Sequence, residues 1–358
     1  METPEPRRGM PSPELSREAF IARFLSRFND PAFTPAKDAL DAIAAIAWDG
    51  YIEGRKSPVT RKAGPGFADP DFDLPVDWIA AHAAVEAAQA RQQDPTGPLR
   101  ALVINGSSRS EHTCPGEMSK SWRLAVLADE TLRAAGIETT MLDLSRLASE
   151  FGREIHPCKA CFSTAAPLCH WPCSCYPNYA LGQVHDWMND IFPMWVEAHG
   201  VFLVTPVNWY QVSSPMKLMM DRMVCADGGN PDPTLTHGKD AKKAKAEELK
   251  GWSYPRHLEG RIFSVVVHGD VEGAENVRRS VSDWLKFMKL TPAGPDAEID
   301  RYIGYWEPYA TSHDALDRDK EIQAEVRIAA EELARSIRAR RDGRLVTTYE
   351  GLTSPRQK

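Results

Sequence analysis

Residues 100–122 read RALVINGSSRSEHTCPGEMSKSW, and this stretch decides how the chain is organised. Ala101 to Ile104 is an apolar run typical of a β-strand, and Asn105-Gly106 ends it. A serine-rich turn with Arg109 follows, and a helix is expected to begin near Ser119. Hydroxyl groups, backbone N–H groups and a helix dipole attract an anion, and arginine adds a bidentate contact. The pattern therefore predicts a phosphate-binding loop, with an ordinary tight turn as the alternative.

Composition excludes several classes of protein. The chain has 358 residues and a formal net charge of −7, so a nucleic-acid-binding surface is not expected. No run of about 18 apolar residues is present, which predicts the absence of a transmembrane helix. The N-terminal residues METPEPRRGMPSPELS lack the apolar core of a secretion signal. We therefore expect a cytoplasmic protein that binds neither nucleic acid nor membrane.

The first 98 residues are predicted to form a helical extension without a chemical motif. Apolar residues at helical spacing predict helices through Leu15–Phe28, through Leu40–Trp48 and over Trp78–Ala90. Residues 57–75, with their proline, glycine and aspartate, are predicted to be a loop. We expect the extension to pack on the main domain or on a partner subunit.

From Pro98 onward, predicted strands and helices alternate. The predicted strands are Leu102–Ile104, Ile137–Leu142, Val201–Val207, Ile262–His268 and Ile299–Tyr305. The predicted helices are Ser119–Ala135, Leu181–His199, Pro215–Val224, Ala274–Met288 and Ala315–Arg341. Five such units predict an α/β fold: a doubly wound, five-stranded parallel sheet with helices on both faces. The expected parts are an extension over residues 1–98, this domain over 99–310, and a C-terminal helix and tail over 311–358. Residues 227–260 are expected to be a polar insertion of unassigned role.

Two more loops are expected at the same edge of the sheet as the phosphate loop, because ligands of such sheets bind at the carboxyl ends of the strands. Thr205–Tyr210 offers a proline, two aromatic rings and exposed backbone, which suits a flat heteroaromatic ring. The alternative is that Trp209 and Tyr210 are ordinary core or rim residues. His268–Gly273 is a glycine-bounded turn, in which we expect His268 to be structural.

Residues 100–290 resemble the NADPH-dependent FMN reductase family, flavodoxin-like flavoproteins that include quinone reductases and iron–sulfur flavoproteins. The resemblance is carried by VINGSSRS (103–110), SKSWRLA (119–125), HPCKAC (156–161) and, best of all, TPVNWYQVSSPMKLMMDRM (205–223). It implies that the FMN phosphate is bound by Ser107, Arg109, Ser119 and Ser121, with Lys120 as an extra cation. It implies that the flavin ring is contacted by Pro206, Val207, Asn208, Trp209, Tyr210, Gly269 and Asp270. Glu111–Glu117 lengthens the first loop, so which of Ser110, Ser119 and Ser121 touch phosphate stays open.

Five of the seven cysteines lie between Cys158 and Cys175, at intervals from which thiolates can converge on one metal. The family's iron–sulfur members carry a compact cysteine motif in this connection, and it begins with the same Cys-x2-Cys. This chain departs from it, because Thr164 stands where the third cysteine would fall. The first choice of ligands for a [4Fe–4S] cluster is Cys158, Cys161, Cys169 and Cys173. Zinc, with His156 or His170 as ligands, and a loop without metal are the alternatives.

Together these features predict an FMN-dependent NAD(P)H oxidoreductase. Reduced flavin would pass electrons to a small acceptor: a quinone, a nitro compound, a metal ion or a free flavin. Because the cofactor carries this chemistry, no catalytic side chain is named. The alternatives are an iron–sulfur flavoprotein that transfers electrons, and a scaffold that has lost FMN and serves as an interaction module. The resemblance also implies a homo-oligomer, either a dimer or a tetramer.

Overall fold

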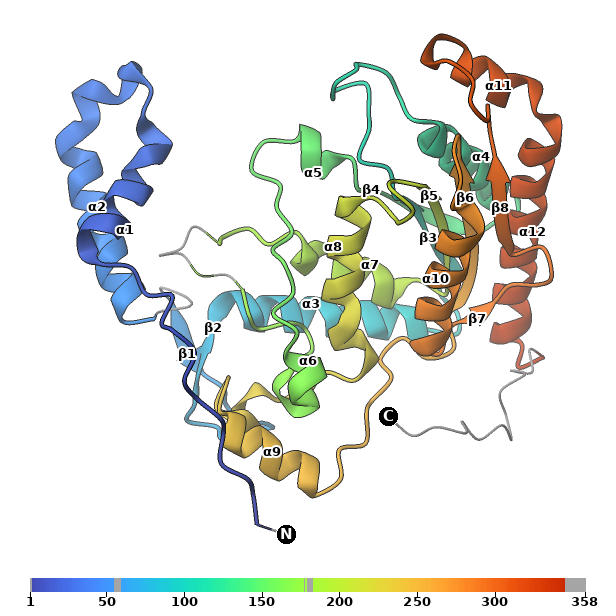
Figure 1. The fold of residues 1–358 in the computed structure, drawn as a ribbon. Helices are drawn as coiled ribbons and strands as arrows, with labels where there is room; N and C mark the ends of the chain where they lie inside the picture. Colours follow the sequence, from blue (N-terminus) through green and yellow to red (C-terminus); the bar gives the residue numbers. More distant parts are fainter. Residues whose placement is uncertain (1, 55–58, 177, 179–182, 345–358) are drawn as a thin grey trace. The chain divides into compact units, whose positions relative to one another are not determined.

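The computed structural model describes residues 2–54, 59–176, 178 and 183–344 (Figure 1). The chain forms two compact units that alternate along the sequence. The first unit consists of residues 1–83, 156–189 and 228–255, and the second of residues 84–155, 190–227 and 256–358. In the described part of the chain, no helix is long and apolar enough to cross a membrane.

A parallel sheet forms the centre of the second unit. Its strands are β3 (Arg100–Asn105), β4 (Glu138–Asp143), β5 (Gly200–Pro206), β6 (Ile262–Gly269), β7 (Thr291–Pro292) and β8 (Glu298–Tyr302). The spatial order is β4-β3-β5-β6, and β6 then pairs with β7 near its start and with β8 along the rest of its length. Since β7 and β8 share one edge position, the sheet has the flavodoxin order 2-1-3-4-5. The predicted doubly wound parallel sheet is confirmed.

The central strands are continuous apolar runs because both of their faces are covered. Every residue of β6 is buried, as are all residues of β5 except Pro206. Parallel strands covered by helices on both sides have this composition. The strand order reverses between β3 and β5, because the chain passes from β3 to β4 on one side and from β5 to β6 on the other. The loops that leave the carboxyl ends of β3 and β5 therefore run in opposite directions and leave a crevice between them.

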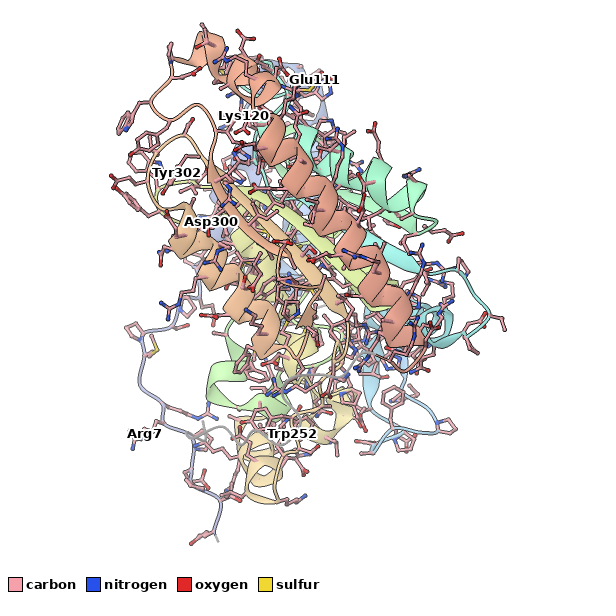
Figure 2. All side chains as sticks on the ribbon, turned by 90° about the vertical axis from the view of Figure 1, so that its right-hand side faces the viewer. Arg7, Glu111, Lys120, Trp252, Asp300 and Tyr302 are labelled. Atoms are coloured by element: carbon pink, nitrogen blue, oxygen red, sulfur yellow. The ribbon has the colours of Figure 1, made fainter. Side chains whose placement is uncertain are left out.

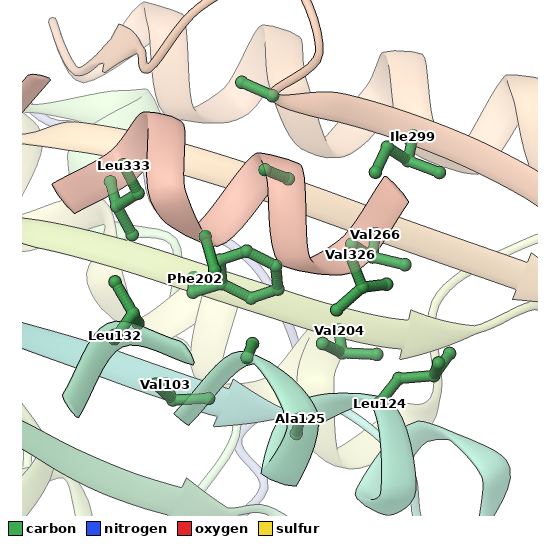
Figure 3. Close-up of a cluster of buried hydrophobic side chains, with 14 of the residues drawn as sticks. Val103, Leu124, Ala125, Leu132, Phe202, Val204, Val266, Ile299, Val326 and Leu333 are labelled. Carbon is green, nitrogen blue, oxygen red and sulfur yellow. The ribbon is translucent and has the colours of Figure 1, made fainter. Parts of the chain in front are cut away.

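Two helices, α4 (Lys120–Ala134) and α12 (Lys320–Arg341), cover one face of the sheet (Figures 1 and 3). Their apolar residues recur at helical spacing and meet the side chains of β3, β5 and β6. Phe202 of β5 is completely buried in this cluster, where Leu132 of α4 and Leu333 of α12 also lie (Figure 3). The C-terminal helix is therefore part of the core that holds the sheet.

The opposite face is covered by α7 (Met188–Glu197), α8 (Ser214–Arg222) and α10 (Ala274–Phe287) (Figure 1). Trp195 of α7 and Trp284 of α10 meet edge to face, with ring centroids 5.8 Å apart. Two shorter helices, α5 (Arg146–Ser149) and α11 (Ser312–Arg318), also belong to this unit.

The first unit holds the N-terminal helices and the cysteine-bearing segment. Its elements are α1 (Arg17–Leu25), α2 (Lys37–Ile52), β1 (Thr60–Lys62), β2 (Asp73–Pro75), the start of α3 (Val76–Gln93), α6 (Cys161–Thr164) and α9 (Ala241–Leu249). Helices α1 and α2 pack through aromatic rings, with Phe20 stacked on Tyr51 at 4.7 Å and edge-on to Trp48 at 5.6 Å.

Three predicted elements differ from the observed ones. The predicted loop over residues 57–75 contains the antiparallel pair β1–β2, while residues 57 and 58 lie outside the described part. The helix predicted from Leu181 begins at Met188, where the Asp186 carboxylate accepts a hydrogen bond from the Met188 N–H at 3.3 Å; residues 181 and 182 are not described. The helix predicted over Ala315–Arg341 is divided at Asp319, which caps α12 by accepting from the Ile322 N–H at 3.0 Å. In the last two cases a local aspartate contact sets the helix start, which apolar periodicity does not reveal.

Candidate functional site

A pocket with a volume of about 270 Å³ lies at the carboxyl edge of the sheet in the second unit. It is formed by the loops that follow β3, β5 and β6, the first turn of α4, and the segment that follows β8. Its lining residues are Ser107, Ser108, Arg109, Ser119, Lys120, Ser121, Pro206, Val207, Asn208, His268, Gly269, Asp270, Glu307, Tyr309, Ser312 and His313. The pocket thus lies where the switch in strand order predicts a ligand.

Every residue predicted for the cofactor site lines this pocket except Trp209 and Tyr210. These two side chains are 96% and 58% exposed, and both have left-handed backbone angles, with φ of 48° and 63°. The prediction that they contact a flavin ring stays a prediction. Sequence reasoning missed the segment after β8, and it named His268 only as a structural residue. The missed positions are Ser108 in the first loop and, after β8, Glu307, Tyr309, Ser312 and His313.

The phosphate loop is held in shape by its own hydrogen bonds. Ser107 Oγ accepts from the Arg109 N–H at 3.0 Å, and the Ser107 N–H donates to Asn105 Oδ1 at 3.2 Å. Gly106 passes so close to β5 that a Cβ atom there would lie 3.0 Å from Thr205 Cβ and 3.1 Å from the Val204 carbonyl oxygen. Because only glycine fits this approach without displacing β5, Gly106 fixes where the loop leaves the sheet.

The first turn of α4 supplies the positive end of a helix. Ser119 is the N-cap, and its Oγ accepts from the Trp122 N–H at 3.0 Å. This contact uses only the oxygen, so the Ser119 hydroxyl proton is still available to donate. Together with the backbone N–H groups of the first turn, it forms a favourable place for an anion.

Arg109 carries the strongest indication of a missing ligand. Its Nη2 is 3.0 Å from Glu117 Oε2, and its guanidinium carbon lies 4.8 Å from the centre of the Tyr309 ring. Its Nε, however, is buried and has no hydrogen-bond partner within the described part of the chain. A phosphate oxygen bound in the pocket would supply this donor with an acceptor. The residues present therefore fit a phosphorylated cofactor.

Lys120 adds a second cation. Its Nζ donates to the Ile303 carbonyl at 3.0 Å, and Figure 2 shows Lys120 toward the same end of β8 as Tyr302. Burial lowers the pKa of Lys120, which the carboxylate of Asp270 opposes and Arg109 reinforces. A bound phosphate would offset both the burial and the repulsion from Arg109.

His268 is a buried neutral histidine at the base of the pocket. Its Nε2 lies 2.7 Å from Ser121 Oγ. Burial, with a contribution from Lys120, lowers the pKa of His268 to about 3. Because the imidazole is neutral, Ser121 can donate to a ligand only when His268 Nε2 itself carries a proton.

The low pKa of His268 predicts that acid destabilises the protein. Between the folded pKa of His268, about 3, and its ordinary value of 6.5, the unfolded chain binds more protons than the folded chain. The contribution of His268 to the free energy of unfolding is therefore fully present above pH 6.5 and is lost as the pH falls toward 3. The expected loss from His268 is on the order of 2–3 kcal/mol between pH 7 and pH 4. We expect His268→Gln to reduce the pH dependence of the unfolding free energy in urea by this amount. The exposed His112, changed to Gln, is the matched control. Equal pH profiles for wild type and His268→Gln would contradict this account.

The structure does not support the predicted metal site at Cys158, Cys161, Cys169 and Cys173. Among the residues described, no group of three or more His, Cys, Asp or Glu side chains could hold a metal ion. The contact that forms joins Cys161 to Cys175, which lies outside the predicted set, with the sulfur atoms 3.7 Å apart. This separation is well beyond the roughly 2.05 Å of a disulfide bond. A hydrogen bond with Cys175 lowers the pKa of Cys161 despite partial burial.

Of the two histidines considered as zinc ligands, His170 makes contacts through both ring nitrogens, whereas His156 makes a ring stack. The His170 ring nitrogens lie against Ser174 Oγ and, at 3.0 Å, Thr236 Oγ1. His156 stacks on Tyr176, with ring centroids 4.7 Å apart. Cys158, Cys169 and Cys173 lie near enough to raise the pKa of the Cys161 thiol, but among the described residues these side chains do not form a group that could hold a metal ion.

A sheet of flavodoxin order with a pocket at its switch point is the arrangement in which flavodoxin-like proteins bind their ligands. The model of the NADPH-dependent FMN reductase family matches residues 99–300, more than half of the chain. The chain belongs to this family, as its sequence motifs implied.

Several solved structures are similar to this chain at low sequence identity. RosB, in a crystal structure with bound 8-demethyl-8-formylriboflavin-5'-phosphate, is 15% identical, with 73% of this chain and 91% of that chain covered and a TM-score of 0.48. An oxidoreductase from Corynebacterium diphtheriae is 15% identical, with coverages of 67% and 97% and a TM-score of 0.37. The azoreductase AzrA is 12% identical, with coverages of 66% and 99% and a TM-score of 0.38. At these levels the likeness says nothing of ligand or activity. No curated protein sequence matches the chain.

Proposed function

We propose that this protein binds FMN in the pocket of the second unit and uses it to oxidise NAD(P)H, passing the electrons to a small acceptor. The observation that carries the proposal is the buried, unsatisfied Nε of Arg109 in a pocket at the switch point of the sheet. Membership of the FMN reductase family supports the same cofactor. When bound, FMN supplies the hydride and electron chemistry.

The pocket divides by chemistry into a phosphate end and a ring end. Donors and cations that would hold the phosphate are Ser107, Arg109, Ser119, Lys120 and Ser121. The loops at Pro206–Asn208 and at Gly269–Asp270 offer backbone and small side chains that suit the edge and face of the ring. In this proposal the chain binds and orients the cofactor, and no side chain moves a proton or attacks the substrate.

The exposed rings of Trp209 and Tyr210 favour a flat acceptor. They follow Asn208, a lining residue, directly in the sequence, and both side chains are exposed. Aromatic rings held in the open stack readily on planar partners, such as a quinone or a nitroaromatic compound. We rank these above a metal ion or a free flavin. The electron-transfer reading that requires an iron–sulfur cluster has no support in the cysteine geometry.

The decisive experiment is a titration of cofactor-free protein with FMN, followed by visible absorption and flavin fluorescence. We expect one FMN per chain to bind, and the bound flavin to be bleached by NADPH or NADH without oxygen and recoloured by a quinone. Iron, sulfide and zinc are measured in the same sample. Failure to bind added FMN would contradict the proposal. Stoichiometric iron and sulfide would instead favour an iron–sulfur flavoprotein that transfers electrons.

A further inference from the structure

The segment that follows β8, residues Gly304–His313, is tied to the phosphate loop by side-chain contacts within the second unit. The Tyr309 ring lies over the Arg109 guanidinium at 4.8 Å. The Tyr309 hydroxyl also bonds to the Glu117 carboxylate, which lowers the pKa of Glu117 and raises that of Tyr309. Glu117 in turn pairs with Arg109 at 3.0 Å. These three side chains form a closed triangle, which we call the Arg109 clamp.

Further contacts anchor both sides of the clamp. His313 Nε2 lies 3.7 Å from Glu117, and the Arg123 Nη1 of α4 donates to the His313 carbonyl at 3.4 Å. Glu307 pairs with Arg318 of α11 at 3.1 Å. The three clamp residues lie in the segments that precede α4 and α11, and contacts with residues of these two helices support them.

The clamp gives a role to the residues that lengthen the first loop. Glu117 is the last residue of the extra stretch Glu111–Glu117, which binding of a phosphate does not by itself require. Of the three clamp residues, Arg109 and Tyr309 line the pocket, and Glu117 is outside its lining. Glu117 therefore does not compete for the anion site. It takes one edge of the guanidinium, and the buried Nε of Arg109 is left for a ligand.

We propose that Tyr309 and Glu117 are positioning residues that fix Arg109 against the phosphate end of the pocket, so that the site selects a flavin bearing a phosphomonoester over riboflavin. This inference rests on the proposed function. Stacking on a ring restricts the plane of a guanidinium, and a carboxylate on one edge sets its rotation. A guanidinium held in this way loses less conformational entropy when the phosphate binds.

Flavin fluorescence titrations of the full-length protein test the proposal, with FMN and riboflavin as the two probes. We expect Tyr309→Ala to weaken FMN binding by about 5- to 10-fold and to leave riboflavin binding unchanged. Glu117→Ala should give a loss of similar size for FMN only. Tyr309→Phe keeps the ring and should lose about twofold. Tyr305→Ala is the matched control, because Tyr305 lies in the same segment, is exposed and is outside the pocket lining.

A double-mutant cycle gives an independent test. If Tyr309 acts through Arg109, Tyr309→Ala should have no further effect on FMN affinity in an Arg109→Ala background. Equal losses for FMN and riboflavin, unchanged FMN affinity, or additive losses in the cycle would each overturn the clamp. Wild-type protein that binds neither flavin would instead show that the proposed function itself is wrong, and the role proposed for the clamp would then be wrong too.

Discussion

Replacing Arg109 by alanine is expected to weaken FMN binding by about 30- to 100-fold, which is the largest effect on binding that we predict. The substitution removes a charged, buried donor whose Nε has no other partner in the described residues. Turnover of enzyme saturated with FMN should change much less, because Arg109 acts on the phosphate end and the reaction occurs at the ring. Fluorescence titration gives the affinity, and steady-state NADPH oxidation at saturating FMN gives the turnover.

Arg133→Ala provides the matched control for this prediction. Arg133 lies near the end of α4, is largely exposed and pairs with Asp129 at 2.9 Å. Removing its charge changes the net charge of the protein equally but leaves the pocket intact. An FMN affinity that stays the same in Arg109→Ala would show that the phosphate is not bound where we place it.

Phe202→Ala should produce the largest loss of stability, about 3–5 kcal/mol in the free energy of unfolding. The Phe202 side chain projects from β5 and is completely buried under the helices α4 and α12 (Figure 3). Its truncation leaves a cavity, because the surrounding side chains are already closely packed and cannot move in to fill it. Urea unfolding followed by tryptophan fluorescence and circular dichroism measures the change.

Phe151→Ala is the control for the core substitution, since Phe151 is fully exposed and should change stability by less than about 0.5 kcal/mol. Phe202→Leu keeps most of the volume and should cost less than Phe202→Ala. A loss below about 1 kcal/mol in Phe202→Ala would mean that this cluster is not the core of the sheet.

The sequence alone predicted the sheet and most of the residues that line the pocket. Val201–Val207 and Ile262–His268 are continuous apolar runs, and such runs form central parallel strands because both faces need apolar cover. In a parallel sheet the carboxyl ends of the strands lie at one edge. This brings together loops that are roughly 60 to 160 residues apart in the sequence. That is why Arg109, Asn208 and Asp270 were predicted to share a site before any contact was known.

Only the tertiary structure revealed the segment that closes the site. Nothing near Glu307–His313 marks these residues as part of an anion site, because their partners Glu117 and Arg109 are distant in the chain. The rule on carboxyl ends applied to β8 would have indicated the segment, but not which side chains turn inward. The cysteine spacing likewise permitted a cluster without requiring one. Spacing limits how far a loop can reach, whereas the direction of each side chain depends on packing against residues that are remote in sequence.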